Sequence, residues 1–397
     1  MVSSAHPVTV TSERDVPAPR LHLTHVEGLR ALAALVVYVN HAYAQSWNPI
    51  LKEYPEGPLS LFTYSLVAGH FAVSVFIAIS GFCLALPVID SGDQLRGGTK
   101  NFFLRRARRI LPPYYAALFL SLALIWTIIG EPTGSLWDVP IVVDWQAIVA
   151  HVLLVQDFFR TGRINYVFWS IAVEWQIYFL FPLLLLAARK WGLLRVTVVT
   201  LVLSFAISLA SKGTRVERAS PHYLGLFAMG VVAAYTVRSR AAIFVKLRSL
   251  PIWSGAAGAS FAAVALAVAY FGWDTTHHNI APFDVGVGLF ACALLVASSL
   301  KETSPSRRLL EWRPLVVLGT FSYSFYLVHA PLLQILWQYL LQPLGVGHEF
   351  TFLFLMSGGL GLVIAATYAF FVVFEKPFLG RRAPSVQLLP VRSAITQ

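Results

Sequence analysis

The chain has 397 residues, of which 57% are hydrophobic and 12% are charged, and its formal net charge is +11. A soluble domain carries about 25% charged residues, so this composition excludes an ordinary soluble protein and indicates a polytopic membrane protein. The positive charge is then a signal of topology and not of a nucleic-acid partner. Cys83 and Cys292 lie in apolar stretches, which favours buried thiols over a disulfide or a metal site.

The segments of the chain follow one another as tail, membrane domain and tail. Residues 1–22 are polar and lack the apolar core of a signal peptide, so they predict a disordered cytosolic tail. Residues 23–378 hold ten apolar segments long enough to cross a bilayer, and residues 379–397 predict a second cytosolic tail. The shorter segment 148–155 predicts an interfacial or re-entrant helix. The predicted spans are 26–47, 65–88, 109–130, 166–188, 193–211, 221–237, 251–272, 282–300, 314–341 and 350–375.

The distribution of basic residues supports this count. With the N-terminus in the cytosol, 24 of the 30 lysines and arginines fall on the inner side, in agreement with the positive-inside rule. An eleventh span would move later basic loops to the outside. We therefore predict an all-α, polytopic helix bundle of about ten spans with both termini cytosolic. The basic residues left outside are Lys52, Arg160, Arg163, Lys212, Arg215 and Arg218.

Two predicted spans carry ionisable groups at membrane depth, where such groups are costly and face a cavity or a partner. The first holds Arg30 at its start and His41 eleven residues later. The fourth holds Glu174 at about the depth of His41, counted at about 1.5 Å per residue, within a polar stripe of Ser170, Glu174 and Tyr178. A carboxylate that orients an imidazole is an acid–base unit, so His41 and Glu174 are the predicted catalytic pair. The alternatives are a satisfied core histidine and a structural ion pair.

The ninth predicted span also carries polar groups at helical spacing. Ser322, Tyr326 and His329 fall on one face, so we expect them to line the same cavity as Ser170 and Tyr178. Interhelical hydrogen bonding by the hydroxyl groups is the alternative interpretation.

Four arginines between residues 105 and 109 stand at a predicted membrane boundary. Arg106 and Arg109 are three residues apart and share a helix face, and guanidinium groups bind phosphates bidentately. This pattern predicts a site for a phosphorylated ligand from the cytosol, with attraction to anionic lipid as the alternative. Pro112 and Pro113 are expected to interrupt the helix that follows.

Two further segments predict structural features of the helices and not a functional site. The Ser80-Gly81 step predicts a close approach between two helices. The segment Glu375-Lys376-Pro377-Phe378 is typical of a helix end on the cytosolic side.

These segments, in this order, resemble the membrane-bound acyltransferase-3 family. They are spread over nearly the whole membrane domain. Two departures are modest: Glu27 stands where the family commonly has aspartate, and Trp175 stands where a second carboxylate often follows Glu174. The matching segments are Glu27-Gly28-Leu29-Arg30 with His41, Ser80-Gly81-Phe82, Arg105-Arg106 to Pro112, Trp169-Ser170 with Glu174 and Phe181-Pro182, Ser322-Tyr323-Ser324 with His329, and Glu375-Lys376-Pro377-Phe378.

The resemblance implies transfer of an acyl group, usually acetyl from acetyl-CoA, to a hydroxyl of a carbohydrate or glycoconjugate at the bacterial inner membrane. Acetyl-CoA is then a substrate, and no permanent cofactor or metal is implied. The family's functional residues carry over to Arg30, His41, Arg106, Arg109 and Glu174. The extracytoplasmic esterase-like domain fused to some members is not expected here. The rival hypothesis is a proton-coupled transporter, for which ionisable groups at mid-depth are also suited.

Overall fold

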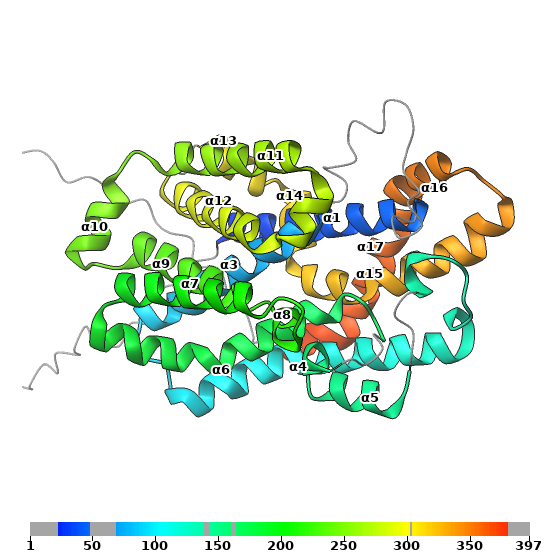
Figure 1. Cartoon of the computed structure of the whole chain (residues 1–397), viewed down its shortest axis with the longest axis horizontal. Helices are drawn as coiled ribbons and strands as arrows, with labels where there is room; N and C mark the ends of the chain where they lie inside the picture. The colour runs from blue at the N-terminus through cyan, green and yellow to red at the C-terminus, as the bar shows by residue number, and fades with distance from the viewer. Residues whose placement is uncertain (1–22, 48–68, 139–142, 160–163, 302–303, 380–397) are drawn as a thin grey trace, which may run out of the picture.

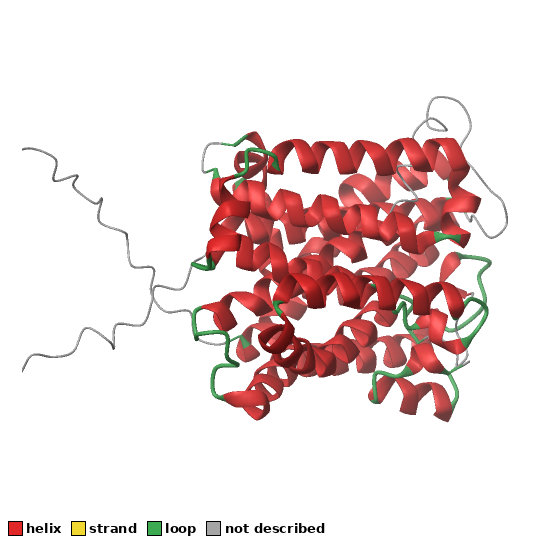
Figure 2. Ribbon diagram, turned by 60° about the vertical axis from the view of Figure 1, so that its left-hand side comes forward, coloured by secondary structure: helices red, strands yellow, loops and turns green. Residues whose placement is uncertain are grey.

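The structure, a computed structural model, describes residues 23–47, 69–138, 143–159, 164–301 and 304–379. Every element in these ranges is a helix, and the long helices run side by side as one bundle (Figures 1 and 2), which confirms the predicted all-α fold. The predicted tail 1–22, and all but the first residue of 379–397, lie outside the described residues. The longer helices are α1 (Thr24–Ser46), α3 (Gly69–Ile89), α4 (Gly98–Leu124), α5 (Trp145–Val152), α6 (Phe168–Trp191), α7 (Leu193–Ala210), α9 (Tyr223–Arg238), α10 (Ala242–Ser249), α11 (Trp253–His278), α12 (Ile280–Leu300), α14 (Arg313–Thr320), α15 (Ser322–Leu336) and α17 (Leu360–Phe370).

Short helices connect or extend these elements. The π-helix η4 (Ile125–Ile129) continues α4, and the last predicted span is built from α16 (His348–Phe354), η9 (Leu355–Gly359), α17 and η10 (Phe371–Glu375). The remaining pieces are η5 (Leu136–Asp138), η6 (Gln156–Phe158), α8 (Arg215–Arg218), α13 (Pro305–Leu310), η7 (Trp337–Leu341), η8 (Gln342–Leu344) and η11 (Lys376–Phe378).

The described ranges contain enough apolar helix for a multi-pass membrane protein. Seven helices are long and apolar enough to cross a membrane, or nine if each of two bent pairs is one span. α1 is not among them because polar residues, including Asn40 and His41, lower its mean hydropathy. Its 23 residues are nevertheless about 34 Å long, enough to cross a hydrocarbon core of about 30 Å.

α4 departs from its predicted boundaries. It begins at Gly98 and runs without interruption to Leu124, so the prediction that Pro112 and Pro113 interrupt it is wrong. A proline inside a helix costs about 3 kcal/mol, which tertiary contacts have to offset. The fully buried Tyr114 supplies such a contact, since its hydroxyl donates a hydrogen bond of 2.9 Å to the carbonyl of His151 in α5. The arginines before the prolines are therefore held on a continuous helix.

The ninth predicted span is broken. α14 and α15 are bent by 79° at Phe321. Gly319, near the end of α14, lies against the backbone of α1, where a Cβ would overlap the carbonyl of Glu27. This contact fixes α14 against α1 and lets α15 begin inside the bundle at Ser322.

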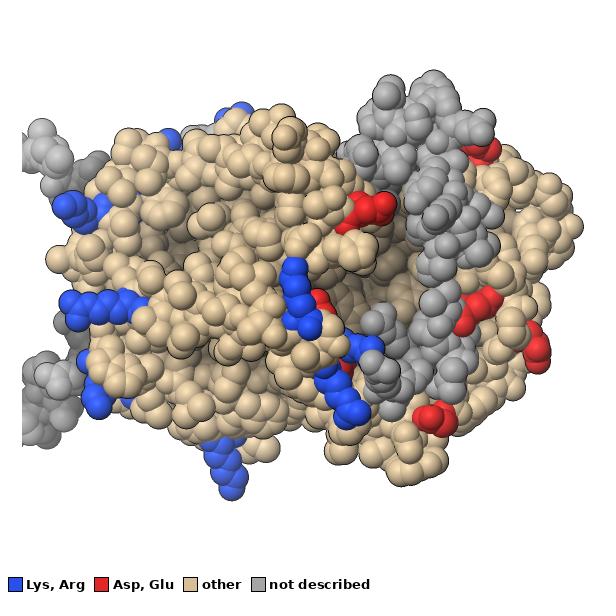
Figure 3. All heavy atoms as spheres, viewed as in Figure 1, with Lys and Arg blue, Asp and Glu red and all other residues tan. Residues whose placement is uncertain are grey.

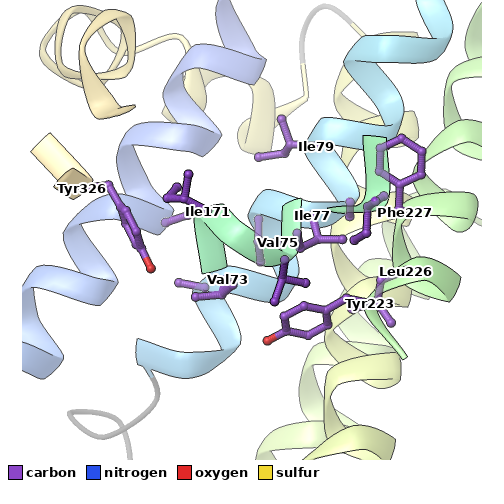
Figure 4. Close-up of a cluster of buried hydrophobic side chains, with 14 of the residues drawn as sticks. Val73, Val75, Ile77, Ile79, Ile171, Tyr223, Leu226, Phe227 and Tyr326 are labelled. Carbon is purple, nitrogen blue, oxygen red and sulfur yellow. The ribbon is translucent and has the colours of Figure 1, made fainter. Parts of the chain in front are cut away.

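α3 lies at the centre of the packing and contacts α1, α9 and α12. Figure 4 shows its valine and isoleucine side chains, with Tyr223 and Phe227 of α9 on one side and Tyr326 of α15 on the other. A Cβ added at Gly81 would overlap the carbonyl of Phe227, and one at Gly230 would overlap that of Ala78. The close helix approach predicted from Ser80-Gly81 is thus confirmed.

Basic residues are distributed unevenly along the bundle. Lys and Arg gather at the left-hand end in Figure 3, where α10 lies, and a second charged group lies over α8. α8 holds Arg215 and Arg218, two of the basic residues assigned to the outside. We call the end that carries α10 and the start of α4 the inner end.

Candidate active site

A cavity of about 590 Å³ lies between α1, α3, α4, α6, α14 and α15. It brings together eight of the ten residues that the sequence nominated for the site. His41 and His329 are not among its lining residues. The nominated residues that line it are Arg30, Arg106, Arg109, Ser170, Glu174, Tyr178, Ser322 and Tyr326.

The inner part of the cavity is cationic. Five arginines line the cavity against three glutamates. The guanidinium of Arg106 is turned inward, and its Nε is buried with no hydrogen-bond partner among the described residues. An unpaired donor of this kind is costly, so the site is suited to an anionic ligand that supplies the missing acceptor.

Arg30 connects the arginines of α4 to α1. It forms an ion pair of 3.3 Å with Glu27, and its Nη2 lies 3.5 Å from the sulfur of Cys83. Arg106 and Arg109 lie close enough to Cys83 to interact with it electrostatically. Cys83 was predicted to be a buried thiol, but it is partly exposed and lines the cavity.

Glu174 does not hydrogen-bond to His41. Its Oε1 accepts a hydrogen bond of 2.6 Å from the hydroxyl of Tyr178, which also lies 3.1 Å from Ser80 Oγ. The expected His41–Glu174 pair is therefore not formed in this structure. The depth estimate placed both groups at one level, but it carried no information on which way each helix turns its side chains.

His41 instead pairs with His329. The distance between His41 Nδ1 and His329 Nε2 is 2.7 Å, and the two rings lie 9° from parallel. His329 is fully buried, whereas His41 is partly exposed. His329, which was expected to line the cavity, is thus the hydrogen-bond partner of His41, the predicted catalytic histidine.

The hydrogen bonds of His329 define the protonation of both rings. His329 Nδ1 lies 3.0 Å from the carbonyl of Phe325 and 2.9 Å from that of Tyr326, so it carries the proton and donates. In the neutral ring, Nε2 of His329 then accepts from Nδ1–H of His41. This leaves a lone pair on Nε2 of His41, which makes no hydrogen bond with any described residue, and such a nitrogen is available as a base or a nucleophile.

The deep end of the cavity lies beside this histidine pair. The hydroxyls of Ser170 and Tyr326 share a hydrogen bond of 2.7 Å there. The ring of Tyr326 is 5.9 Å from that of His329, and the ring of Tyr166 meets His41 edge-on at 4.8 Å. Going from the inner end toward the outer side, the arginines come first, then the deep end of the cavity, and then the histidine pair.

A network of amides lies one turn further out. Gln45, four residues after His41, donates a hydrogen bond of 2.9 Å to Gln334, which also accepts one of 2.8 Å from Ser135. All three side chains are buried, and their hydrogen bonds join α1 to α15 and to the segment before η5. Within the described ranges no three His, Cys, Asp or Glu side chains could hold a metal ion.

Glu375 is a cavity residue that was not predicted from the sequence. It was read as part of a helix end, but its buried carboxylate lines the cavity and accepts hydrogen bonds from the backbone N–H and the hydroxyl of Ser324. It thereby satisfies the first turn of α15, which begins inside the bundle without a side-chain cap of its own. The signal that could have revealed Glu375 was its position as a charged residue at the end of an apolar segment.

The sequence from 24 to 373 matches the family described as "Acyltransferase domain". Because the match covers most of the chain, the chain belongs to this acyltransferase-3 family. Fold and family together define a multi-pass membrane enzyme that transfers acyl groups, and the transporter alternative is set aside.

Several bacterial relatives are similar to the chain over most of its length. It is 26% identical over 406 residues to the acyltransferase MdmB of Streptomyces mycarofaciens, which covers 93% of this chain and 95% of that protein. It is 25% identical to the putative peptidoglycan O-acetyltransferase YrhL of Bacillus subtilis, covering 79% of this chain and 49% of that one. It is also 25% identical to the O-acetyltransferase OatA of Staphylococcus aureus, over 82% of this chain and 53% of that protein. The chain thus spans about half the length of the last two, and no solved structure matches it significantly.

Proposed function

We propose that the protein is an O-acyltransferase that moves an acyl group, acetyl from acetyl-CoA, to a hydroxyl of a carbohydrate or glycoconjugate at the bacterial inner membrane. One observation carries the proposal: a cavity whose inner part holds the buried Nε of Arg106 ends beside His41, and among the described residues neither this Nε nor Nε2 of His41 has a hydrogen-bond partner. The first feature suits a phosphorylated donor and the second suits acyl transfer.

The donor enters from the inner end. Its phosphate groups bind Arg106 and Arg109, because guanidinium groups bind phosphate oxygens bidentately and these two share a helix face. Arg30 is engaged with Glu27 and lies deeper, beside Cys83. The extended arm of coenzyme A is long enough to follow α1 over the roughly 16 Å between Arg30 and His41.

The chemistry takes place at His41. As the acceptor oxygen attacks the thioester carbonyl, Nε2 of His41 takes the hydroxyl proton and then gives it to the departing thiolate of coenzyme A. His329 holds the ring and stabilises its charged form. Transfer through an acyl-imidazole uses the same nitrogen and proceeds in two steps. Because the Ser170–Tyr326 hydrogen bond closes the deep end, the thioester reaches His41 when these two hydroxyls part.

Two facts support a carbohydrate acceptor. YrhL is named for peptidoglycan, a carbohydrate polymer. His41, a partly exposed residue, belongs to the outer half of α1, away from the arginines. Donor and acceptor would then meet inside the bundle from opposite sides.

The test uses purified protein in detergent with acetyl-CoA labelled in the acetyl group. We expect Arg106→Ala to weaken acetyl-CoA binding and His41→Ala to bind it normally but neither hydrolyse nor transfer the acetyl group. The matched control is Lys100→Ala, an exposed cation of the same helix that does not line the cavity. If no version binds acetyl-CoA, or if Lys100→Ala loses as much binding as Arg106→Ala, the donor assignment is wrong.

A further inference from the structure

A second buried polar cluster lies outside the cavity and joins α3, α9 and α12. Asp284 of α12 is fully buried and accepts three hydrogen bonds. They come from Ser74 at 2.6 Å, from His222 at 2.8 Å and from His70 at 3.2 Å. Neither the motifs singled out in the sequence nor the proposed donor site uses these residues.

His70 is the only one of the two histidines in this cluster that reaches the surface. Its side chain is 24% exposed, against 3% for His222. Its Nε2 faces Asp284 and also lies 3.1 Å from the hydroxyl of Tyr223. The carboxylate therefore fixes the proton on Nε2 and leaves a lone pair on Nδ1, for which the described residues supply no partner.

His70 lies at the level of the catalytic histidine. Gly69 packs closely against Asn40, the residue before His41. A Cβ added to Gly69 would lie 2.4 Å from the Cβ of Asn40 and 2.7 Å from its Cγ. α1 and α3 are thus in contact where both carry an imidazole. The two histidines present similar groups: each is oriented by a buried partner on one ring nitrogen and keeps the other nitrogen open.

Aromatic rings pack against His70 and its neighbour Phe71. Trp169 stacks on it with ring centres 5.5 Å apart and planes 10° from parallel. Trp273 contacts Phe71, next to His70, because the chain turns at Gly272, whose φ of 74° breaks α11. Trp169 also borders a small polar cavity of about 30 Å³ lined by Asn165, Arg218 and other polar residues.

We infer that His70 and Trp169 form a subsite for the acceptor, and that the acceptor is a molecule with several hydroxyl groups. One hydroxyl donates to Nδ1 of His70 and an apolar face of the molecule lies against the indole, while a second hydroxyl faces His41. Asp284 is a positioning residue that holds the His70 ring. The assignment of this subsite to the acceptor rests on the proposed function, whereas the exposure of His70 on the outer side can be tested without it.

The first experiment measures access from the outer side. In a background carrying Cys83→Ser and Cys292→Ser, we would label His70→Cys and His222→Cys in sealed vesicles of known orientation with a membrane-impermeant maleimide. We expect His70→Cys to react from the outer side about tenfold or more faster than His222→Cys, the matched control on the same carboxylate. Equal rates, or reaction of His70→Cys only from the cytosolic side, would overturn the subsite whatever the enzyme does.

The second experiment separates the acceptor from the donor. With acetyl-CoA and chitotetraose as a soluble carbohydrate probe, we expect His70→Ala to raise the KM for the oligosaccharide about tenfold, with acetyl-CoA hydrolysis within about twofold of wild type. His70→Asn, which keeps a polar side chain, should recover part of the loss. A parallel fall of transfer and hydrolysis would show a structural role only. Failure of the wild type to hydrolyse acetyl-CoA would instead contradict the proposed function.

Discussion

Nδ1 of His41 lies 2.7 Å from Nε2 of His329, across two helices that are 288 residues apart in the chain. The pairing gives His329 the role that the sequence analysis assigned to Glu174, namely to orient the imidazole of His41. Glu174 stays in the cavity with Tyr178, next to the arginines. The proposed acid–base group and the proposed donor site are therefore adjacent but distinct.

We predict that transfer needs both histidines. We expect His41→Ala to lower kcat by about 10²–10⁴, the usual contribution of general acid–base catalysis, and His329→Ala to lower it by about tenfold or more. Because the two act as one unit, the double variant should be no worse than His41→Ala alone. His278→Ala, an exposed histidine bonded to its own helix, is the control. Additive losses in the double variant would show that the pair does not work together.

We predict that acetyl-CoA binding depends on the shape of the guanidinium at position 106 as well as on its charge. Arg106→Lys keeps the charge but loses bidentate geometry, so we expect acetyl-CoA affinity intermediate between wild type and Arg106→Ala. Isothermal titration at two salt concentrations measures this. An affinity for Arg106→Lys equal to that of the wild type would mean that Arg106 acts only through its charge.

The hydrogen bond between Ser170 and Tyr326 is expected to keep water from the thioester. Ser170→Ala removes that bond and leaves the tyrosine ring in place. We predict that the ratio of acetyl-CoA hydrolysis to acetyl transfer rises severalfold, because the deep end opens without the acceptor. The ratio is measured with labelled acetyl-CoA, and an unchanged ratio would contradict a closing role for this pair.

Glu375 supports the start of α15. Glu375→Ala leaves the backbone N–H of Ser324 without its partner, and loss of such a cap costs about 1 kcal/mol of stability. Glu375→Gln keeps an acceptor oxygen and should be less destabilised. Thermal unfolding in detergent compares the two variants; equal loss would show that the charge of Glu375, and not its hydrogen bonds, is what matters.

A pH dependence follows from Glu311, which lies outside the membrane-spanning segments. Partial burial raises the pKa of this carboxyl, but hydrogen bonds from Thr24 and Arg307 outweigh it and hold the pKa below its usual value. A carboxylate with a lowered pKa in the folded state stabilises above its ordinary pKa and loses that contribution as the pH falls through the lower value. We expect Glu311→Gln to unfold at a lower temperature than wild type at pH 7 and the difference to shrink below about pH 4. A difference that grows at low pH would contradict this.

Much of the architecture could be predicted from the apolar segments. Their positions follow from composition, since a helix that crosses a bilayer must be long and apolar. The break at Phe321 could not be predicted, because residues 314–341 form one apolar run and the bend depends on the contact between Gly319 and α1. Local sequence carries no record of a contact made by a helix nearly 300 residues away.

The site was predicted in part. Charge marked the arginines as a phosphate site and depth marked Glu174 as a buried polar group, but the sequence did not show that they share one cavity. His329 was not predicted as the partner of His41, because depth fixes a level along each helix but not the direction in which a side chain points. Asp284 and His70 were missed for a related reason: they lie in different spans, 214 residues apart in the chain, and only the fold brings them together.

The most direct test of the account is whether coenzyme A occupies the cavity beside Cys83. Cys83 lines the cavity next to Arg30, whereas Cys292 is buried in α12 and serves as an internal control. Purified protein would be treated with a thiol-reactive label with and without acetyl-CoA, and labelling at each cysteine measured by mass spectrometry. The account predicts that acetyl-CoA slows labelling of Cys83 and not of Cys292, and that Arg106→Ala loses this protection. Labelling of Cys83 at the same rate with saturating acetyl-CoA would contradict the donor site.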